Sequence, residues 1–239
     1  MFTVLKLGGS VITDKSKPKT AREDRIRRLM KVISDWRGDL VLIHGGGSFG
    51  HYAASRVSDL QKGVSEVRRA MHELLSIVEK VAVDSGVRVY PVTPATVLYS
   101  LNVLVDLLER GCVPLLYGDV VPDHDGDGFR IMSGDEIAER VSWLGPDRVG
   151  FGMSVDGVYP RTPEEGEPLR ELSPDEARDL ARQLEGSAGV DVTGGIAEKL
   201  RRAARIAERG AEVYMFDARD PENVDRFLRG EHVGTRITR

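Results

Sequence analysis

MFTVLKLGGS (residues 1–10) and DLVLIHGGGSFGH (residues 39–51) are built in the same way. In each stretch a short apolar run predicts a strand, over residues 3–5 and 40–43, and glycines follow shortly after it. Runs as apolar as these are typical of parallel strands that are buried on both faces. Because ligands of open α/β sheets bind beyond the carboxyl ends of the strands, the two glycine segments are predicted to lie at a binding site.

The rest of the chain continues this alternation. Further strands are predicted over residues 87–90, 113–117, 148–151 and 212–216. Helices are predicted around the apolar residues recurring between 64 and 81, from a capping box at 173–176 to about 184, over 195–209, and from residue 221. A polar turn at 123–128 predicts the tip of a hairpin. We therefore expect an α/β fold, a three-layer αβα sandwich with a mainly parallel central sheet, in one domain spanning residues 1–239.

The composition restricts the classes of function. Of the 239 residues, 34 are Lys or Arg and 38 are Asp or Glu, and the net charge of −4 gives no overall basic bias toward nucleic acid. No apolar run approaches the ~20 residues that a membrane-spanning helix needs, and the N-terminal run is too short for a signal peptide. The single cysteine, Cys112, excludes an intrachain disulfide and a cysteine-rich zinc site. We expect a cytoplasmic protein without a membrane or nucleic-acid partner.

Three glycine segments are candidates for phosphate binding. They are KLGGS at 6–10, HGGGSFGH at 44–51, and TGG at 193–195, which opens the predicted helix that carries Lys199. Glycine lets backbone N–H groups approach a phosphate closely, and a helix N-terminus favours negative charge. Lys6 and Lys15 supply further positive charge in the N-terminal region.

A dinucleotide-dependent oxidoreductase is an alternative on this evidence. GGGSFG at 45–50 fits the GxGxxG fingerprint loosely, and the chain contains no Walker A sequence. That interpretation leaves Gly8, Gly9 and the segment at 193–195 without a role.

Six segments, taken together and in order, resemble the amino acid kinase superfamily. They are KLGGS at 6–10, HGGGSFGH at 44–51, GDVV at 118–121, MSGD at 132–135, VDGVY at 155–159, and DVTGG at 191–195 with Lys199 after it. Within the superfamily, the chain resembles the isopentenyl phosphate kinases in two further features: the second segment ends in a histidine, His51, and GTRIT at 234–238 resembles the C-terminus of that family. The resemblance implies the amino acid kinase fold, with an acceptor-binding N-terminal part and a nucleotide-binding C-terminal part.

The resemblance also implies a reaction and a set of site residues. The reaction is transfer of the γ-phosphoryl group of ATP to isopentenyl phosphate, in the archaeal-type alternative mevalonate pathway of isoprenoid biosynthesis. The residues implied as catalytic are Lys6, Lys15, His51 and Lys199. Those implied for ATP binding are Lys6, Gly8, Gly9, Ser10, Gly47, Ser154, Asp156, Gly195 and Lys199. Those implied for acceptor binding are Gly46, His51, Ser133, Gly134 and Asp135.

Several further expectations follow from the resemblance. Mg²⁺ is expected to arrive with ATP and to be held through phosphate oxygens, without a dedicated cluster of protein ligands. A homodimer is expected through the edge of the sheet and neighbouring helices. The helix that contains Met71, Leu74, Leu75 and Val78 is a candidate wall for the isoprenoid tail, although core packing is an alternative interpretation of each of these residues.

The sequence departs from the family at two places. Ser154 stands where the family's Thr-Asp-Val-Asp-Gly segment has its first carboxylate, and the stretch from Tyr52 to Gly63 is shorter than usual. Fosfomycin kinase shares the HGGGSFGH type of segment and is the nearest alternative enzyme. Kinases of the superfamily that act on glutamate, acetylglutamate, carbamate, aspartate or UMP, and a non-catalytic nucleotide-binding regulator, also stay open.

Overall fold

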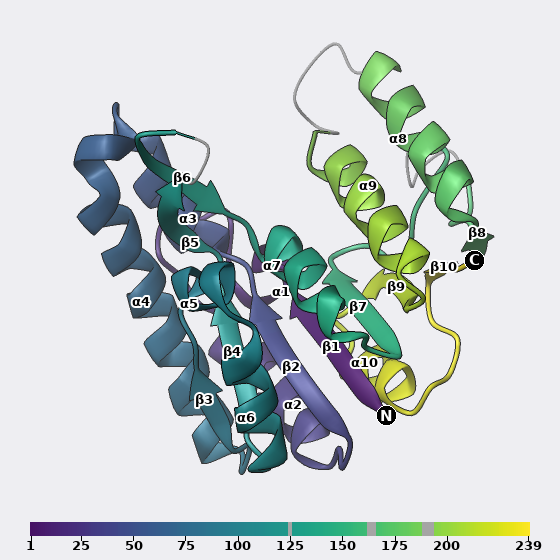
Figure 1. Cartoon of the computed structure of the whole chain (residues 1–239), viewed down its shortest axis with the longest axis horizontal. Coiled ribbons are helices and arrows are strands. Elements are labelled where there is room, and N and C mark those ends of the chain that lie inside the picture. Colours follow the sequence, from purple (N-terminus) through teal and green to yellow (C-terminus); the bar gives the residue numbers. More distant parts are fainter. Residues whose placement is uncertain (124–125, 162–165, 188–193) are drawn as a thin grey trace.

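The central sheet has eight strands and is almost entirely parallel. The computed structural model describes residues 1–123, 126–161, 166–187 and 194–239 (Figure 1). The strands of the sheet, in spatial order, are β3 (Val89–Pro91), β4 (Val113–Tyr117), β2 (Asp39–His44), β1 (Phe2–Leu7), β7 (Arg148–Met153), β9 (Glu212–Asp217), β10 (Thr235–Ile237) and β8 (Glu171–Leu172). Among these pairs, only β9 and β10 run antiparallel.

Alternating side chains of the inner strands enter two different hydrophobic cores. On β1, Val4 belongs to one core and Leu5 to the other; on β2, Val41 and Leu42 divide in the same way. Successive side chains of a strand point to opposite faces, so a sheet covered on both sides needs apolar residues at every position. This requirement explains why the strands are continuous apolar runs without a polar alternation.

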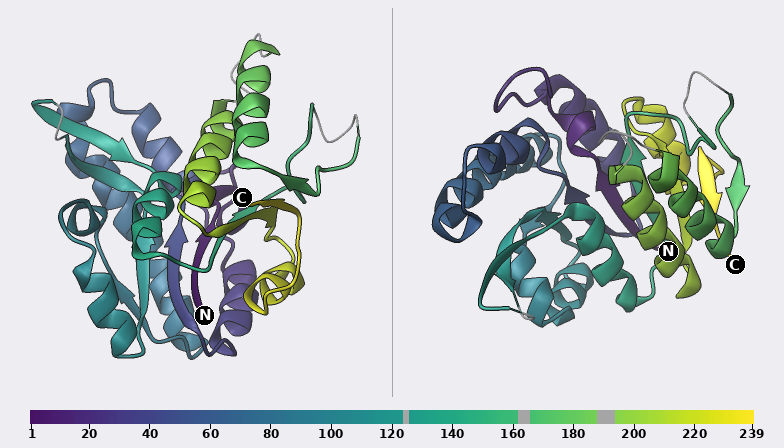
Figure 2. Two further views of the ribbon diagram at one scale, coloured as in Figure 1. Left: turned by 45° about the vertical axis from the view of Figure 1, so that its right-hand side comes forward. Right: turned by 90° about the horizontal axis from the view of Figure 1, so that it is seen from above.

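Helices cover both faces of the sheet, which confirms the three-layer αβα architecture (Figure 2). The helices are α1 (Gly9–Ile12), α2 (Glu23–Ser34), α3 (Gly47–Ser55), α4 (Leu60–Asp84), α5 (Pro94–Tyr99), α6 (Asn102–Glu109), α7 (Gly134–Val141), α8 (Pro174–Ser187), α9 (Gly194–Glu208) and α10 (Pro221–Leu228), with a 3₁₀ turn at Ser142–Leu144. Residues of α2, α4 and α10 pack in one core, and residues of α6 to α9 pack in the other.

The predicted capping box at the start of α8 is confirmed. The Ser173 backbone N–H donates to the Glu176 carboxylate, and the Glu176 N–H donates to the Ser173 hydroxyl. Each residue thus satisfies a backbone donor that the first helical turn leaves free. Asp220 similarly caps α10, directly before Pro221.

The predicted hairpin is also present. Strands β5 (Asp119–Asp123) and β6 (Gly128–Met132) pair antiparallel outside the main sheet, and residues 124–125 of its tip lie outside the described residues. The hairpin, at the upper left of Figure 1, and the pair α8–α9, at the upper right, both extend beyond the ends of β1 and β2. The end of the sheet between them is where the glycine segments lie.

Strands β8 and β10 were not predicted, since each is only two or three residues long and carries no turn signal of its own. The edge strand β3 also begins two residues later than predicted. In the described part of the chain, no helix is both long and apolar enough to cross a membrane.

Candidate active site

A cavity of about 550 Å³ lies at the carboxyl ends of β1, β2 and β7. Three helices of eight or more residues, α3, α7 and α9, begin at its wall, where Gly47, Gly134 and Gly195 line it. The first N–H groups of a helix have no partner within the helix, and the helix dipole adds partial positive charge there. Three such helix ends at one cavity favour the binding of a multiply charged anion.

The first two glycine segments are in direct backbone contact with each other. A Cβ on Gly9 would lie 2.2 Å from the Gly47 nitrogen, and a Cβ on Gly45 would lie 2.8 Å from the Gly9 nitrogen. Gly47 also has a φ of +49°, a left-handed conformation that favours glycine. Side chains at these positions would force the two segments apart, so the glycines define the shape of the cavity wall.

Two of the predicted lysines share one carboxylate. Lys6, near the end of β1, places its Nζ 2.7 Å from Asp135 Oδ1, and Lys199 on α9 donates to Asp135 Oδ2. Lys6 is buried, with 7% of its surface exposed. The three residues come from β1, α7 and α9, and each of them lines the cavity. The group carries two positive charges and one negative charge, so it retains a net positive charge toward a bound phosphate.

The pKa values of Asp135 and Lys199 are both lowered, for different physical reasons. Burial alone would raise the pKa of the Asp135 carboxyl, but the ammonium groups of Lys6 and Lys199 outweigh burial and hold it far below its usual range. Burial, together with the nearby Lys6 ammonium, lowers the pKa of Lys199 to about 8, although the Asp135 carboxylate opposes this shift. Lys199 is therefore mostly charged at neutral pH and loses its charge in mildly alkaline solution.

Lys15 and His51 line another part of the same cavity. Both side chains are exposed, and His51 lies in the second turn of α3. Desolvation lowers the pKa of His51, and the Lys15 ammonium lowers it further. His51 is therefore mostly uncharged at neutral pH, but a neutral imidazole still donates one hydrogen bond, so the Lys15 ammonium and the His51 ring form a second candidate contact for a phosphate.

The cavity has an apolar part beyond these charges. Its lining there consists of apolar residues from α3, α4 and β6, namely Ala54, Val67, Met71, Ile131 and Met132. Of the four helix residues predicted as a tail wall, only Met71 lines the cavity; Leu74 and Val78 belong to a hydrophobic core, and Leu75 packs against it. The core interpretation is therefore right for these three residues.

Asp119 also lines the apolar part and was missed by the sequence analysis, although it lies inside the GDVV segment. Its carboxylate is buried and is 3.1 Å from Arg68 Nε. Burial raises the pKa of Asp119, although the N–H of Val120 and the Arg68 guanidinium oppose this shift. A buried carboxylate gives no pattern in the sequence that distinguishes it from an exposed turn residue.

The structure brings together nearly all of the predicted site residues. Those that line the cavity are Lys6, Gly8, Gly9, Ser10, Lys15, Gly46, Gly47, His51, Ser133, Gly134, Asp135, Ser154, Gly195 and Lys199. Asp156 does not line it; its exposed side chain accepts a hydrogen bond from the Tyr159 hydroxyl. Residues 191–193 of the third predicted segment lie outside the described residues.

Ser154 takes part in the wall of the cavity through a neutral hydrogen bond. The Ser10 hydroxyl donates to Ser154 Oγ at 3.3 Å, which joins the segment after β1 to the segment after β7. The Gly8 N–H donates to the Gly152 carbonyl at 2.8 Å in the same region. Gly152 lines the cavity and was also missed by the sequence analysis, because a glycine within an apolar run gave no separate signal.

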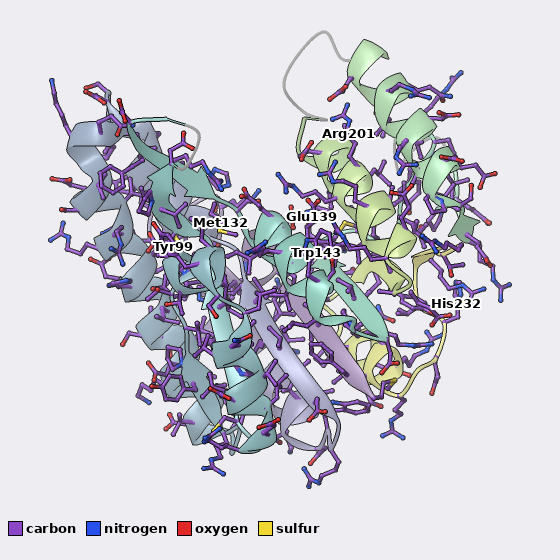
Figure 3. The ribbon with its side chains drawn as sticks, in the orientation of Figure 1. Tyr99, Met132, Glu139, Trp143, Arg201 and His232 are labelled. Atoms are coloured by element: carbon purple, nitrogen blue, oxygen red, sulfur yellow. The ribbon has the colours of Figure 1, made fainter. Side chains whose placement is uncertain are left out.

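An ion-pair network joins α7 to α9. Two residues of this junction, Glu139 and Trp143, are labelled in Figure 3. Glu139 follows Asp135 by one helical turn, and its carboxylate accepts hydrogen bonds from Arg202 at 2.8 Å and Arg205 at 2.6 Å. The Arg209 guanidinium lies 4.5 Å from the ring centre of Trp143 in the adjoining 3₁₀ turn. The network fixes the helix that carries Lys199 against the helix that carries Asp135.

Comparisons with known proteins agree with this geometry. The model of the "Amino acid kinase family" matches residues 1–217. The chain is 34% identical over 261 residues to the isopentenyl phosphate kinase of Methanothermobacter thermautotrophicus and 35% identical over 255 residues to that of Haloferax volcanii. The first alignment covers 98% of each chain, and the second covers 99% of this chain and 98% of the other. The crystal structure of a T. acidophilum isopentenyl phosphate kinase product complex superposes with a TM-score of 0.80 at 31% identity, over 99% of this chain and all of that one.

Proposed function

The chain belongs to the amino acid kinase family, and on that premise we propose that it is a phosphotransferase that transfers the γ-phosphoryl group of ATP to isopentenyl phosphate, with isopentenyl diphosphate as the product. The one observation that carries this proposal is the division of a single cavity. Its cationic part is formed by Lys6, Lys15 and Lys199 with three helix N-termini, and an apolar part continues beyond them. A phosphate ester with a short hydrocarbon tail has the same two-part character.

The reaction class determines what the protein has to supply. The attacking group is already a phosphate oxyanion, so no side chain is needed to remove a proton from it. The main barrier is the repulsion between two anions and the charge that develops on the transferring group. We assign Lys6 and Lys199 to the charge of the nucleotide phosphates and transferring group, Lys15 to the region where the two substrates meet, and His51 to the acceptor phosphate.

Backbone donors are the other part of this mechanism. We propose that the N–H groups around Gly8, Gly9 and Ser10 bind the nucleotide phosphates and that those around Gly46 and Gly47 lie between them and the acceptor. These groups are already oriented before the substrates bind, because their loops pack against each other. Prior orientation reduces the reorganisation that the transition state would otherwise require.

The resemblance implies Asp135 for acceptor binding, but in this proposal Asp135 acts on the lysines and does not itself contact the acceptor phosphate. Both of its oxygens face ammonium groups, and a carboxylate held in its charged form would repel a phosphate. Its contribution is to orient the Lys6 and Lys199 side chains, which are long and otherwise free to rotate.

The residues fit a nucleotide that arrives with Mg²⁺. The cavity offers cations and N–H donors for phosphate oxygens, and among the described residues no group of three His, Cys, Asp or Glu side chains is placed to hold a metal ion by itself. Mg²⁺ typically keeps several waters and binds through substrate phosphates, where it neutralises charge. We further propose a homodimeric, cytoplasmic enzyme, as the resemblance to the family implies.

An acceptor-dependent ADP-release assay tests the function. The protein would be supplied with ATP, Mg²⁺ and one acceptor at a time: isopentenyl phosphate, longer isoprenoid monophosphates, fosfomycin, glutamate, acetylglutamate, carbamate, aspartate and UMP. We expect release with isopentenyl phosphate and a decrease in kcat/KM as the tail outgrows the cavity. Preference for fosfomycin or an amino acid would contradict the acceptor assignment, and ATP binding without any turnover would favour a regulator.

His51→Ala tests the acceptor side of the cavity. Loss of one hydrogen bond to a charged group costs about 1.5–3 kcal/mol, so KM for isopentenyl phosphate should rise about 10- to 150-fold. KM for ATP should change by less than about threefold, since His51 is assigned to the acceptor. Steady-state kinetics in both substrates measures the two values, and equal increases in the two KM values would contradict the assignment of His51.

A further inference from the structure

Thr13 connects the two glycine segments through its side chain. It follows α1 directly, and its hydroxyl donates to the Gly9 carbonyl at 2.6 Å. The same hydroxyl accepts a hydrogen bond from the Ser48 backbone N–H at 2.9 Å. Gly9 lies after β1 and Ser48 lies after β2, so one side chain bonds to the backbone of both segments.

The position of Thr13 is closely determined by its surroundings. Its side chain is buried, with 1% of its surface exposed. A Cβ on Gly47 would lie 2.1 Å from the Thr13 hydroxyl oxygen, which means that the loop passes directly over this group. Both hydrogen-bonding directions of the hydroxyl are used, so neither the Gly9 carbonyl nor the Ser48 N–H is left without a partner there.

Thr13 does not line the cavity, although the segments that it connects do. Gly9 and Ser10 lie on the side assigned to the nucleotide, and Gly46 and His51 lie on the side assigned to the acceptor. In phosphoryl transfer the attacking and leaving oxygens must be nearly in line, and a displacement of 1 Å can cost about 100-fold in rate. The hydrogen bonds of Thr13 therefore act on the separation between the two substrates.

From this geometry we propose that Thr13 is a positioning residue, which sets the distance and angle between the bound nucleotide and the acceptor phosphate. This inference rests on the proposed kinase function. It assigns to Thr13 no contact with either substrate and no part in binding either one alone. Its effect is confined to the geometry in which both are bound, so it should appear in kcat and leave the two KM values nearly unchanged.

Thr13→Val and Thr13→Ser test the inference, with Thr3→Val as the matched control. Valine keeps the shape of threonine without the hydroxyl, and serine keeps the hydroxyl. Thr3 is also buried, on β1, but its hydroxyl has no hydrogen-bond partner within the described residues. We expect Thr13→Val to lower kcat about 10- to 100-fold with both KM values within about threefold of the wild type. Thr13→Ser should recover kcat to within about threefold, and Thr3→Val should leave it unchanged.

Loss of folding is separated from loss of positioning by measuring the folded fraction and ADP affinity of each variant. A Thr13→Val protein that is folded, binds ADP normally and keeps its kcat would overturn the inference. The inference would also be overturned if kcat of Thr13→Val fell only in proportion to its folded fraction, or if Thr13→Ser failed to restore kcat.

A wild-type protein that phosphorylates no acceptor would refute the proposed function, and the inference is then judged separately by hydrogen exchange at the Ser48 amide. Faster exchange in Thr13→Val than in Thr3→Val supports the connection between the segments, and equal exchange overturns it.

Discussion

Two sides of the cavity are held together in different ways. On the glycine side, residues 8–13 and 45–48 meet backbone to backbone, with neutral hydrogen bonds and no space for a Cβ at several positions. On the helix side, α7 and α9 are joined by long charged side chains, from Asp135 and Glu139 to Lys199, Arg202 and Arg205.

The two sides differ in how far they can adapt to a ligand. Close backbone contacts leave little room for a second arrangement, whereas a long charged side chain can change rotamer and partner while its backbone stays in place. In the proposed mechanism, the glycine side therefore defines where the phosphates bind, and the helix side supplies charge that can be redistributed as they arrive. Lys199 can exchange its contact with Asp135 for a contact with phosphate without a change in the backbone.

Lys199→Ala should cause the largest loss of activity and tests the charge that the helix side supplies. Removing one charged donor to a transition state typically lowers kcat by about 10²- to 10³-fold, and Lys199 is one of two ammonium groups on Asp135. The matched control is Arg201→Ala, two positions along α9, where the side chain pairs with Glu185 of α8. Steady-state kinetics should show little change in the control; similar losses in both variants would mean that α9 contributes only by being folded.

Gly47→Ala tests the rigid side. The new methyl group would lie 2.1 Å from Thr13 Oγ1 at a φ of +49°, so we expect a loss of about 3 kcal/mol or more in the free energy of unfolding. Gly86→Ala is the control, because Gly86 has a φ of +84° with open space around it and should lose only about 1–2 kcal/mol. Urea unfolding measures both. A Gly47→Ala loss no larger than that of Gly86→Ala would contradict the close packing of the segments.

Glu139→Gln tests the helix side and should have a smaller effect. Burial raises the pKa of Glu139, but Arg205, Arg202 and Arg209 outweigh it and hold the pKa below its usual range. The charged carboxylate therefore stabilises the fold above its unfolded-state pKa, and this contribution disappears as pH falls through the lower folded-state value. We expect Glu139→Gln to lower the free energy of unfolding by about 1–3 kcal/mol at neutral pH, as measured by urea unfolding. The control is Glu171→Gln, which removes the exposed ion pair between Glu171 and Arg236 and should cost about 0–1 kcal/mol. Equal losses would mean that the network stabilises the fold no more than an ordinary surface pair does.

The smallest expected effect is the change in ATP use as the pH rises slightly above neutral. With its pKa at about 8, Lys199 is half charged at that pH, so kcat/KM for ATP should fall about twofold there and about tenfold at pH 9. Lys199→Arg should remove this decline, because a guanidinium keeps its charge.

The same titration has the opposite sign for stability. The folded-state pKa of Lys199 lies below its ordinary value of 10.5, so between pH 8 and 10.5 the unfolded chain binds more protons at this residue. Its contribution to stability therefore rises with pH in that window. Circular dichroism at pH 9 should show a folded protein; unfolding that accompanies the loss of activity would contradict a titration of Lys199.

The sequence predicted the fold well where a local signal exists. The apolar runs identify the inner strands because a strand buried on both faces needs apolar residues at every position, and the Ser173–Glu176 box identifies the start of α8. Strands β8 and β10 could not be predicted in this way, since they depend on pairing with each other and with β9.

The sequence identified the kinds of residue that form the site, but it did not reveal the contacts between them. The glycine segments and lysines pointed to phosphate, yet the contact of Lys199 with Asp135 joins residues 64 positions apart, which no sequence spacing reveals. Thr13 was missed because a threonine after a short helix is common and only the fold brings Ser48 to it. Asp156 belongs to a matching motif but does not line the cavity, and its carboxylate accepts a hydrogen bond from the Tyr159 hydroxyl.

The fluorescence of Trp143 can report on the helix side of the cavity, which α7 and α9 form. Trp143 is one of only two tryptophans in the chain, it is 65% exposed, and the guanidinium of Arg209, the residue directly after α9, lies over its ring. Indole emission responds to a cation stacked on the ring and to the water around it. The protein thus carries an intrinsic fluorophore at the junction of α7 and α9, and nucleotide titrations can follow the seating of α9 in solution without an attached label.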